Sequence, residues 1–439
     1  MKNVNISQLA NCIDQEIQLQ GWVQNKRDGK GIAFIILRDG SGFCQCIVSQ
    51  EDIGDVEFEK TKLLSLETSV RLTGKVVADE RQLGGVEVHA TALEIVGTSE
   101  DYPISKKAHG VDFLLDKRHL WLRSRKQWAI MRVRNEVIFG IHSFFQQEGY
   151  VQMDAPIFTG NACEGTTDLF ETEFFDKPAY LSQSGQLYGE AMAMAMGKIY
   201  TFGPTFRAEK SKTRRHLSEF WMIEPEMAFY NLEMTMDVIE KFIQYVVNRV
   251  LENCKTELEV LERDTTTLQN VAKPFVRLSY NDAVKILKGE KEVNGKQSIK
   301  MLEEDLASKE NRLKEIATEA SEKEGILAKG GLKKGKIAYY ERSIQQLREE
   351  QKQLEEDCRN IPNWISSALN FEYGSDLGGS DETVITRLFD TPVMVYDWPK
   401  VIKAFYMKES ESDSTLVKGV DVLAPEGYGE IVGGGERET

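Results

Sequence analysis

The residues best suited to chemistry lie within residues 205–227, in the stretch TFRAEKSKTRRHLSEFWMIEPEM. Its ends alternate apolar and polar residues and its middle is basic, so the pattern predicts two antiparallel strands joined by an exposed loop. Residues two apart on a strand share a face. Arg207 is therefore expected beside Glu209 at the end of the first strand. Glu224 is likewise expected beside Glu226 on the second.

Two interpretations of this charged hairpin stay open from spacing alone. Charges on half-buried strands need partners, so the hairpin is either a solvated surface closed by an internal salt bridge or a ligand site. A fixed Arg207, with Arg214, Arg215 and His216 on the loop, suits a polyphosphate better than any other common ligand.

Length and charge bound the class of protein. The chain has 439 residues and a formal net charge of −15, with a pI near 5.1. The length predicts two or three domains, and the charge predicts a soluble protein and argues against a simple polybasic nucleic-acid binder. The overall charge does not exclude a basic face on part of the surface.

The six cysteines are scattered without a CxxC pair, which predicts neither a disulfide framework nor a structural zinc site. With no leader peptide and no apolar run of membrane-spanning length, we expect a cytoplasmic protein without a membrane partner.

Residues 1–100 alternate short β-type runs with Gly and Asp turns, which predicts a small β-barrel or sandwich. On its surface Arg27, Phe34 and Gln45 are candidates for a patch that stacks on and hydrogen-bonds unpaired bases. Taken alone, Phe34 is expected in the core, because aromatic residues on strands usually pack inward.

Residues 101–130 form an expected linker, basic towards its end, and residues 131–439 a second domain. This domain begins with an amphipathic helix that ends at Gly149 and a strand with Pro156 near its end. An Ala/Met-rich helix follows the turn that contains Gln183 and Gln186, and its methionines are expected to fill a core. Residues 295–360 are rich in Lys, Glu, Gln and Leu and predict an inserted antiparallel helical hairpin, most simply a structural or partner-binding arm.

Together these motifs resemble the class II aminoacyl-tRNA synthetases, in the aspartate, asparagine and lysine subgroup. The helix, strand and Pro156 are similar to the family's first motif and the 205–227 hairpin to its second. The resemblance implies an α+β protein: an N-terminal OB-fold that binds the anticodon, then an antiparallel-sheet catalytic domain with the helical insertion. The first motif implies a homodimer.

For ATP and the metal, the resemblance implies a set of roles. Arg207 would hold the α-phosphate and the amino acid's carboxylate, and Glu209 would accept from the adenine amino group. Glu430, as a catalytic residue beside Arg207, would bind Mg²⁺ together with Asp421. The remaining ATP contacts would come from Arg215, His216 and Leu217.

For the amino acid, Glu164 would bind the ammonium group. Arg437 would point at the substrate side chain. The rest of the pocket would come from Ser182, Gln183, Gln186, Arg207 and Gly433. In the OB-fold, Phe34 would stack on the middle anticodon base beside Arg27 and Gln45, which reverses the expectation that Phe34 is a core residue.

The resemblance implies ATP-dependent ligation of asparagine to tRNA(Asn) through an asparaginyl-adenylate. Aspartate enzymes of the subgroup carry a Lys where this chain has Gly189, and a buried cation opposite a neutral amide would be costly, so asparagine is favoured. An aspartate enzyme and a non-catalytic tRNA-binding paralogue are the alternatives.

The family's third motif, GxGxER, is expected some tens of residues beyond Arg437, and the sequence ends at Thr439. We therefore expect either a shortened version of a longer synthetase or a fragment without efficient activation.

Overall fold

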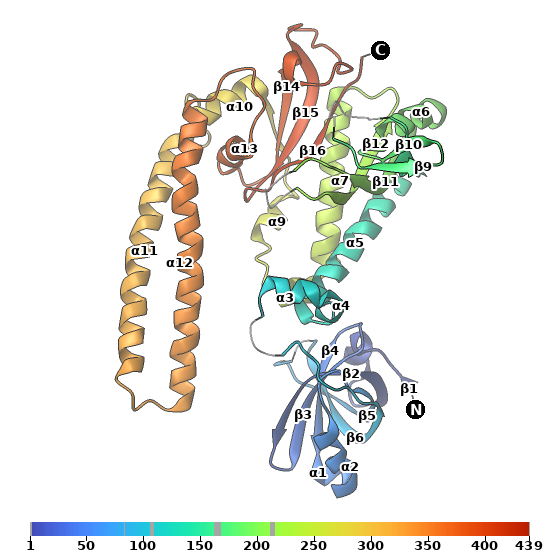
Figure 1. Cartoon of the computed structure of the whole chain (residues 1–439), viewed down its shortest axis with the longest axis vertical. Helices are drawn as coiled ribbons and strands as arrows, with labels where there is room; N and C mark the ends of the chain where they lie inside the picture. The colour runs from blue at the N-terminus through green and yellow to red at the C-terminus, as the bar shows by residue number, and fades with distance from the viewer. Residues whose placement is uncertain (1, 83, 106–108, 162–167, 211–215, 439) are drawn as a thin grey trace. The chain divides into compact units, whose positions relative to one another are not determined.

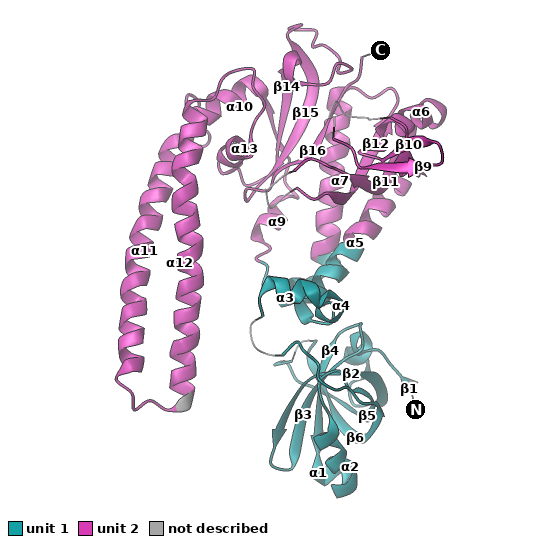
Figure 2. Ribbon diagram, viewed as in Figure 1, with its two compact units in different colours: residues 1–136, 252–263 teal, residues 137–251, 264–439 magenta. Residues whose placement is uncertain are grey.

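The computed structural model describes residues 2–82, 84–105, 109–161, 168–210 and 216–438. Figure 2 shows two compact units, residues 1–136 with 252–263 and residues 137–251 with 264–439. The long helices α5 (Arg125–Gln147) and α7 (Leu232–Asn253) contribute residues to both units. The domain boundaries expected near residues 100 and 130 stay predictions.

A closed β-barrel makes up most of the first unit (Figure 1). Its strands run in the order β1-β2-β3-β4-β6-β5, and β2 also pairs with β5, which closes the sheet. On β3, Ala33, Ile35 and Leu37 are fully buried while the residues between them are half-buried, as alternation along a strand requires. This is the OB-fold that the sequence predicted. The strands are β1 (Lys2–Asn3), β2 (Glu16–Gly29), β3 (Ile32–Arg38), β4 (Phe43–Ser49), β5 (Ser69–Ala78) and β6 (Val86–Gly97).

Short helices complete the first unit. Trp128 on α5 packs edge-on against Phe43 with ring centroids 5.2 Å apart, and its indole N–H donates to the carbonyl of Gly40 at 2.8 Å. These contacts fix the start of α5 on the barrel. The other helices of the unit are η1 (Ile6–Cys12), α1 (Gln50–Ile53), α2 (Asp55–Glu59), η2 (Lys60–Leu63), α3 (Val111–Asp116), α4 (Arg118–Trp121) and α8 (Lys255–Val260).

The second unit is a mixed helix and sheet domain (Figure 1). One sheet has the order β12-β11-β7, with β11 and β12 antiparallel, and a small sheet has the order β8-β10-β9. A further sheet has the order β13-β14-β15-β16. The strands are β7 (Val151–Met153), β8 (Phe158–Thr159), β9 (Glu171–Phe174), β10 (Lys177–Leu181), β11 (Lys198–Phe206), β12 (Glu219–Met227), β13 (Val276–Ser279), β14 (Val393–Pro399), β15 (Leu416–Ala424) and β16 (Gly429–Gly435).

Aromatic side chains anchor the sheets of this unit to its helices. Tyr200 of β11 is fully buried and stacks on Phe145 of α5 at 4.8 Å between ring centroids. Tyr280 and Trp398, both buried, pack at 5.0 Å under the other large sheet. The shorter helical segments are α6 (Gln186–Met196), α9 (Thr266–Asn270), α10 (Tyr280–Leu287), α13 (Gly379–Thr386) and η3 (Lys400–Ile402).

Two local expectations from the sequence are wrong. The run VITRLFDTPVMVYDWP, residues 384–399, has the apolar and β-branched character of a strand. The structure confirms this for β14 (Val393–Pro399), whereas α13 covers the start of the run, because a helix there buries Val384 and Ile385 fully. The methionines of α6 do not all fill a core, since Met194 is 87% exposed. Alternate residues of a helix do not share a face, so the Met192, Met194 and Met196 spacing cannot point one way.

The inserted helical hairpin is present as α11 (Ser298–Ala328) and α12 (Lys334–Leu369), which run antiparallel (Figure 1). Its base belongs to the core of the domain, where Leu302, Ile361 and Ala368 are fully buried with Tyr280. Within the described residues, no helix combines the length and the apolar composition needed to span a membrane.

Candidate active site

The β11–β12 hairpin is the frame of the candidate site. The two strands pair antiparallel along their whole length, as predicted. The backbone N–H of Arg207 donates to the carbonyl of Ser218 at 2.9 Å, so the pairing continues one residue past β11. Arg207 and Glu209 therefore follow the strand and do not lie on it, which corrects the predicted strand end.

Arg207 has the environment of a ligand-binding residue. Its side chain is half-buried, and among the described residues no carboxylate lies within ion-pair distance of its guanidinium. Glu209 is exposed and is likewise unpaired within the described chain. An internal salt bridge at Arg207 is therefore absent from the described hairpin, and a half-buried guanidinium in this state suits an anionic ligand.

Several predicted ATP and amino-acid contacts fall on loops. Glu164 and Arg215 lie outside the described residues, as does Arg214. His216 and Leu217 lie on the segment that leads into β12, and both are exposed. The roles implied for these residues stay predictions.

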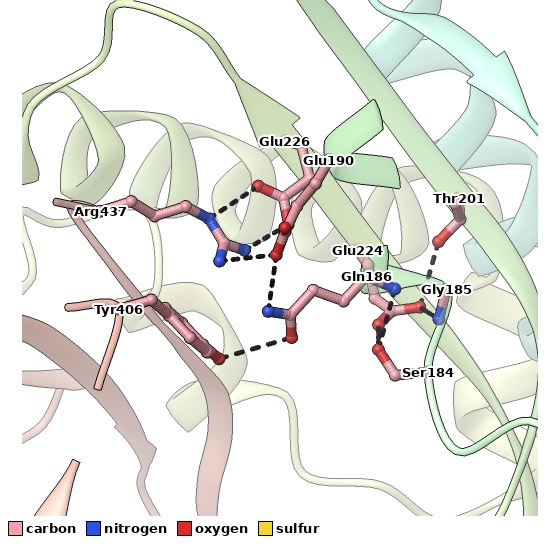
Figure 3. Close-up of polar contacts among 9 residues, drawn as sticks. All are labelled: Ser184, Gly185, Gln186, Glu190, Thr201, Glu224, Glu226, Tyr406 and Arg437. Atoms are coloured by element: carbon pink, nitrogen blue, oxygen red, sulfur yellow. Dashed lines mark hydrogen bonds and ion pairs between the residues drawn. The ribbon is translucent and has the colours of Figure 1, made fainter. Parts of the chain in front are cut away.

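Glu224 on β12 ties the turn before α6 to the hairpin (Figure 3). Its carboxylate accepts hydrogen bonds from the Ser184 hydroxyl, from the Gly185 N–H at 2.8 Å and from the Thr201 hydroxyl at 3.1 Å. A Cβ atom on Gly185 would lie 2.9 Å from the Thr201 hydroxyl oxygen and 3.0 Å from Glu224 Oε2. Only glycine therefore fits at this position without displacing Glu224.

A second cluster surrounds Arg437, which follows β16 (Figure 3). Its guanidinium pairs with Glu226 of β12 at 2.6 Å from Nη2 and with Glu190 of α6 at 2.8 Å from Nη1. The ring of Tyr406 lies under the guanidinium, with 4.7 Å from the Arg437 Cζ atom to the ring centroid. These contacts hold the Arg437 fork in one orientation.

Gln186 joins the Arg437 cluster to the turn before α6. Its side-chain N–H donates to Glu190 at 2.9 Å, and its carbonyl oxygen lies 3.5 Å from the Tyr406 hydroxyl (Figure 3). The structure thus brings Gln186 and Arg437, both predicted from the sequence, into one polar cluster. Its members come from α6, β12 and the segments around Tyr406 and Arg437.

Burial and neighbouring charges shift the pKa of a carboxyl group in this cluster. Burial raises the pKa of Glu226, and the positive charge of Arg437 opposes that rise. The carboxylates of Glu190 and Glu224 add to the rise, because like charges disfavour ionisation. The two carboxylates paired with Arg437, those of Glu226 and Glu190, retain acceptor capacity for the donors of a bound ligand.

A pair of carboxylates lies on the neighbouring strands β15 and β16. Asp421 and Glu430 converge over Gly433, where a Cβ atom would lie 3.6 Å from Asp421 Oδ1 and 2.7 Å from Glu430 Oε1. The Lys403 ammonium donates to Asp421 Oδ2 at 2.6 Å. Burial raises the pKa of Asp421 to about 6 and also raises the pKa of Glu430, in both cases against the opposing charge of Lys403. The ionised forms of these two buried carboxylates would be stabilised by a bound cation.

Ser182 and Gln183 lie in the same turn as Gln186 and are both buried. The Ser182 hydroxyl donates to the carbonyl of Ser184 at 2.7 Å, so its hydrogen bond shapes the turn. The predicted contact of Ser182 with the amino acid stays a prediction.

In the first unit, Arg27, Phe34 and Gln45 lie on adjacent strands of the barrel. Phe34 alternates with buried residues and is half-buried on the outer side of β3, so the expectation from its residue type, a core position, is wrong. The Arg27 guanidinium lies over its ring at 4.7 Å, and Gln45 donates to Glu87 at 2.9 Å. The sequence therefore placed an aromatic and polar patch correctly on the barrel surface, and its ligand stays a prediction.

The structure adds site residues that the sequence did not single out for a role. Glu226 was noticed only as the strand neighbour of Glu224, and the i+4 spacing of Glu190 from Gln186 on α6 was a usable signal. Lys403 and Tyr406 lie in the segment IKAFYM, residues 402–407, which resembles the asparagine enzymes of the family, but their partners lie on distant segments of the chain and could not be read from spacing.

The chain thus joins a closed barrel of the OB type to a domain whose β11–β12 hairpin presents an arginine without a carboxylate partner among the described residues, a combination that fits the aminoacyl-tRNA synthetase class. Residues 110–439 match the family of tRNA synthetases class II (D, K and N), and residues 17–96 match the OB-fold nucleic acid binding domain. The chain belongs to this class II D, K and N family.

Individual relatives are similar over nearly the whole chain. An asparagine–tRNA ligase of Sorangium cellulosum is 43% identical over 98% of this chain and 82% of its own length. One of Symbiobacterium thermophilum is 42% identical over 100% of this chain and 84% of its own length. The crystal structure of asparaginyl-tRNA synthetase from Pyrococcus horikoshii complexed with asparaginyl-adenylate superposes with a TM-score of 0.75 at 35% identity, covering 100% of this chain and 84% of that one.

Proposed function

We propose that this chain ligates asparagine to tRNA(Asn), with ATP, through an asparaginyl-adenylate. The observation that carries the choice of amino acid is the pairing of Arg437 with Glu226 and Glu190. The asparagine–tRNA ligases among its relatives support the same choice. Adenylate formation followed by acyl transfer needs bound ATP, amino acid and tRNA, and the two units supply a candidate site for each.

The Arg437 cluster suits a carboxamide better than a carboxylate. An asparagine side chain offers one acceptor oxygen and two N–H donors, so Arg437 can donate to its oxygen while Glu226 or Glu190 accepts from its nitrogen. An aspartate side chain has only acceptors and would place a negative charge beside those carboxylates. The absence of a lysine at Gly189 works in the same direction, because a lysine there would favour aspartate.

The chemistry divides between Arg207 and the carboxylate pair. The amino acid's carboxylate attacks the α-phosphorus of ATP, the bond to the bridging oxygen breaks, and pyrophosphate leaves. Arg207 binds the α-phosphate and the attacking carboxylate and neutralises charge as the phosphorus becomes pentacovalent. Glu209, Arg215, His216 and Leu217 are proposed to hold the remainder of ATP.

Mg²⁺ is the metal proposed for this site, and the residues fit it. The Asp421 and Glu430 carboxylates that meet over Gly433 are hard oxygen ligands, and no Cβ fills the space between them. Among the described residues, no group of three His, Cys, Asp or Glu side chains could hold a metal by itself. This agrees with an ion whose remaining ligands are phosphate oxygens and water. When bound, Mg²⁺ would neutralise charge on the phosphates.

In the second step, the terminal ribose hydroxyl of tRNA attacks the acyl carbon of the adenylate and AMP leaves. Neither step needs a covalent enzyme nucleophile, so positioning and charge neutralisation carry the catalysis. Ser182, Gln183, Glu164 and Gly433 are proposed to complete the amino-acid pocket.

We propose that the enzyme is a cytoplasmic homodimer whose interface is formed by α5 and the segment up to Pro156. The exposed side chain of Phe139 on α5 supports this interface.

Amino-acid-dependent exchange of labelled pyrophosphate into ATP tests the proposed function. We expect exchange with asparagine and, with aspartate, a rate at least about a hundredfold lower, as expected where a site must leave buried polar groups unpaired. Exchange with aspartate in preference to asparagine would overturn the substrate, and tRNA binding without any exchange would indicate a non-catalytic paralogue.

Glu224→Gln is expected to raise the KM for asparagine about tenfold or more. The amide can accept through only one atom and places a donor towards Ser184, Gly185 or Thr201, and a lost hydrogen bond to a charged group, here a half-buried one, costs about 1.5–3 kcal/mol. The matched control is Glu219→Gln, which neutralises an exposed carboxylate on the same strand. Pyrophosphate exchange measured against asparagine concentration gives the comparison, and equal KM values for the two variants would contradict a positioning role for Glu224.

Phe34→Ala is expected to weaken tRNA charging and to spare pyrophosphate exchange. Stacking of one base on an aromatic ring contributes about 1–3 kcal/mol, so kcat/KM for tRNA is expected to fall roughly tenfold to a hundredfold. The exposed Trp22 on β2 of the same barrel provides the control variant Trp22→Ala. Equal losses in charging and exchange would argue against an anticodon role for Phe34.

A further inference from the structure

The tip of the helical hairpin, residues 325–340, differs in charge from the rest of the chain. It reads GILAKGGLKKGKIAYY, with four lysines and no acidic residue, in a protein whose formal net charge is −15. Positive charge is therefore concentrated at one end of α11 and α12. A basic patch on an acidic protein is a local feature that a charged partner can recognise.

Ion pairs within the shaft of the hairpin engage many of its basic residues. Lys309 pairs with Asp357 at 2.9 Å and thereby joins the two helices. Further ion pairs along the shaft join Arg312 to Glu315, Glu319 and Glu350, Arg348 to Glu324, Lys323 to Glu319, Lys300 to Glu304 and Lys309 to Asp305. The pairs that join α11 to α12 hold the register of the two helices. Acidic residues outnumber basic ones along the shaft, residues 298–324 and 341–369, so the shaft differs in sign of charge from the tip.

Three lysines of the tip lack such partners among the described residues. Lys329, Lys333 and Lys336 are all exposed, and within the described residues none of them lies within ion-pair distance of a carboxylate. The tip thus presents several unneutralised ammonium groups from neighbouring positions. Nothing in the described hairpin explains them as contributors to its stability.

Exposed apolar and aromatic side chains lie among these lysines. Tyr339 is 67% exposed, and its ring meets that of Tyr340 edge-on with centroids 5.5 Å apart. Ile326 and Ile337 are 36% and 37% exposed. An aromatic ring beside lysines is the combination with which proteins stack on bases and bind the adjoining phosphates.

The hairpin holds its tip far from the core that anchors it. From Ile361, which is fully buried, to the start of α12 at Lys334, a helical rise of 1.5 Å per residue gives about 40 Å. The connection at Gly330 and Gly331 turns tightly, with φ of +67° and +80°. A stiff arm of this length, whose end carries lysines and no acidic residue, suits a macromolecular ligand and not a small substrate.

We propose that the hairpin tip binds the phosphate backbone of tRNA, with Lys329, Lys333 and Lys336 contacting phosphates and Tyr339 packing against an exposed base or ribose. The identification of the polyanion as tRNA rests on the proposed function, which makes tRNA a substrate. The tip reads no sequence, because lysine contacts to phosphate carry no base information. It adds affinity outside the anticodon and acceptor contacts.

The test compares the full chain carrying Lys329→Ala, Lys333→Ala and Lys336→Ala with a shaft control carrying Lys300→Ala, Lys314→Ala and Lys352→Ala. Both variants lose three positive charges at exposed positions. Filter binding of a tRNA(Asn) transcript and of a second tRNA is measured from low to moderate salt. For the tip variant we expect affinity for both tRNAs to fall on the order of tenfold and the salt slope to shrink by up to about three, about 0.9 for each lost phosphate contact.

Kinetics separate this inference from the proposed function. The tip variant is expected to raise the KM for tRNA in aminoacylation and to leave asparagine-dependent pyrophosphate exchange at the wild-type rate. Equal tRNA affinity in the tip and shaft variants overturns the inference. A wild-type chain without pyrophosphate exchange defeats the proposed function, while the binding comparison still decides the role of the tip.

A further variant, Tyr339→Ala, and a different polyanionic ligand, an anionic lipid vesicle, complete the test. Tyr339→Ala is expected to weaken tRNA binding without changing the salt slope, because it removes stacking and no charge. Vesicles containing phosphatidylserine provide a different polyanion. If the tip lysines prove necessary for binding to these vesicles and not for binding to tRNA, the inference is wrong and the tip contacts an anionic membrane surface.

Discussion

Replacing Arg207 with alanine is expected to lower asparagine-dependent pyrophosphate exchange about a thousandfold. The guanidinium is half-buried, lies at the end of β11, and has no carboxylate partner among the described residues, so its charge is available to the phosphate. A preorganised donor aimed at charge that develops in the transition state contributes about 3–4 kcal/mol, which corresponds to this loss. The reduction is expected mainly in kcat, because pentacovalent phosphorus carries more charge than bound ATP.

Two variants make this result specific. Arg207→Lys keeps the charge and loses the planar fork, so we expect it to recover less than about a tenth of the wild-type rate. Arg277→Ala removes another arginine of the same unit, one already paired with Asp237, and is expected to leave exchange close to wild type. If Arg207→Ala raised only the KM for ATP, Arg207 would bind the ground state and transition state equally.

The local patterns of the sequence predicted the elements that hold this site well. Alternation along residues 205–227 predicted the β11–β12 hairpin, and spacing of apolar residues at three and four predicted α11 and α12. Both patterns depend on neighbours in the chain, so the sequence contains them directly. The segment around α13 was misjudged because tertiary packing of Val384 and Ile385 outweighs their β-propensity.

The partners within the site were less accessible from the sequence. Arg437 was expected to face the substrate side chain, but its ion pair with Glu226 joins residues 211 positions apart. Asp421 and Lys403 are similarly joined by the fold and not by spacing. A sequence motif identifies candidate site residues, whereas the tertiary fold determines which of their side chains contact each other.

We propose distinct tasks for the two sets of charged residues. Arg207 and the pair Asp421 and Glu430 combine cationic and metal-binding chemistry suited to phosphates. The Arg437 cluster contains more carboxylates than cations, so it suits a ligand that donates hydrogen bonds. Rate and substrate choice are therefore expected to respond to different substitutions.

Replacing Arg437 with methionine is expected to lower kcat/KM for asparagine by about 10²–10³. The substitution removes the donor to the amide oxygen and leaves the partly exposed Glu226 and Glu190 without their cation. Once bound substrate covers these groups, loss of one member of a hydrogen-bonded charge pair costs about 2–5 kcal/mol. Arg207→Ala, by contrast, is not expected to change the preference for asparagine. Exchange kinetics with asparagine and with aspartate measure both effects.

Glu226→Gln is the matched comparison, because it removes a carboxylate and keeps Arg437. It is expected to narrow the preference for asparagine over aspartate, since a neutral amide no longer repels a second carboxylate. An unchanged preference would show that Glu226 does not meet the substrate side chain.

Stability against pH gives a readout that does not depend on substrate. Burial raises the pKa of Glu226 and Arg437 opposes the rise, so Arg437→Met is expected to raise that pKa further. A raised carboxyl pKa in the folded state means that the folded protein binds more protons than the unfolded chain, and stability then falls as pH rises above the unfolded pKa. The Tm of Arg437→Met is therefore expected to fall further below wild type at pH 7.5 than at pH 5. The difference should disappear in Arg437→Met combined with Glu226→Gln, because no titrating group then remains at position 226.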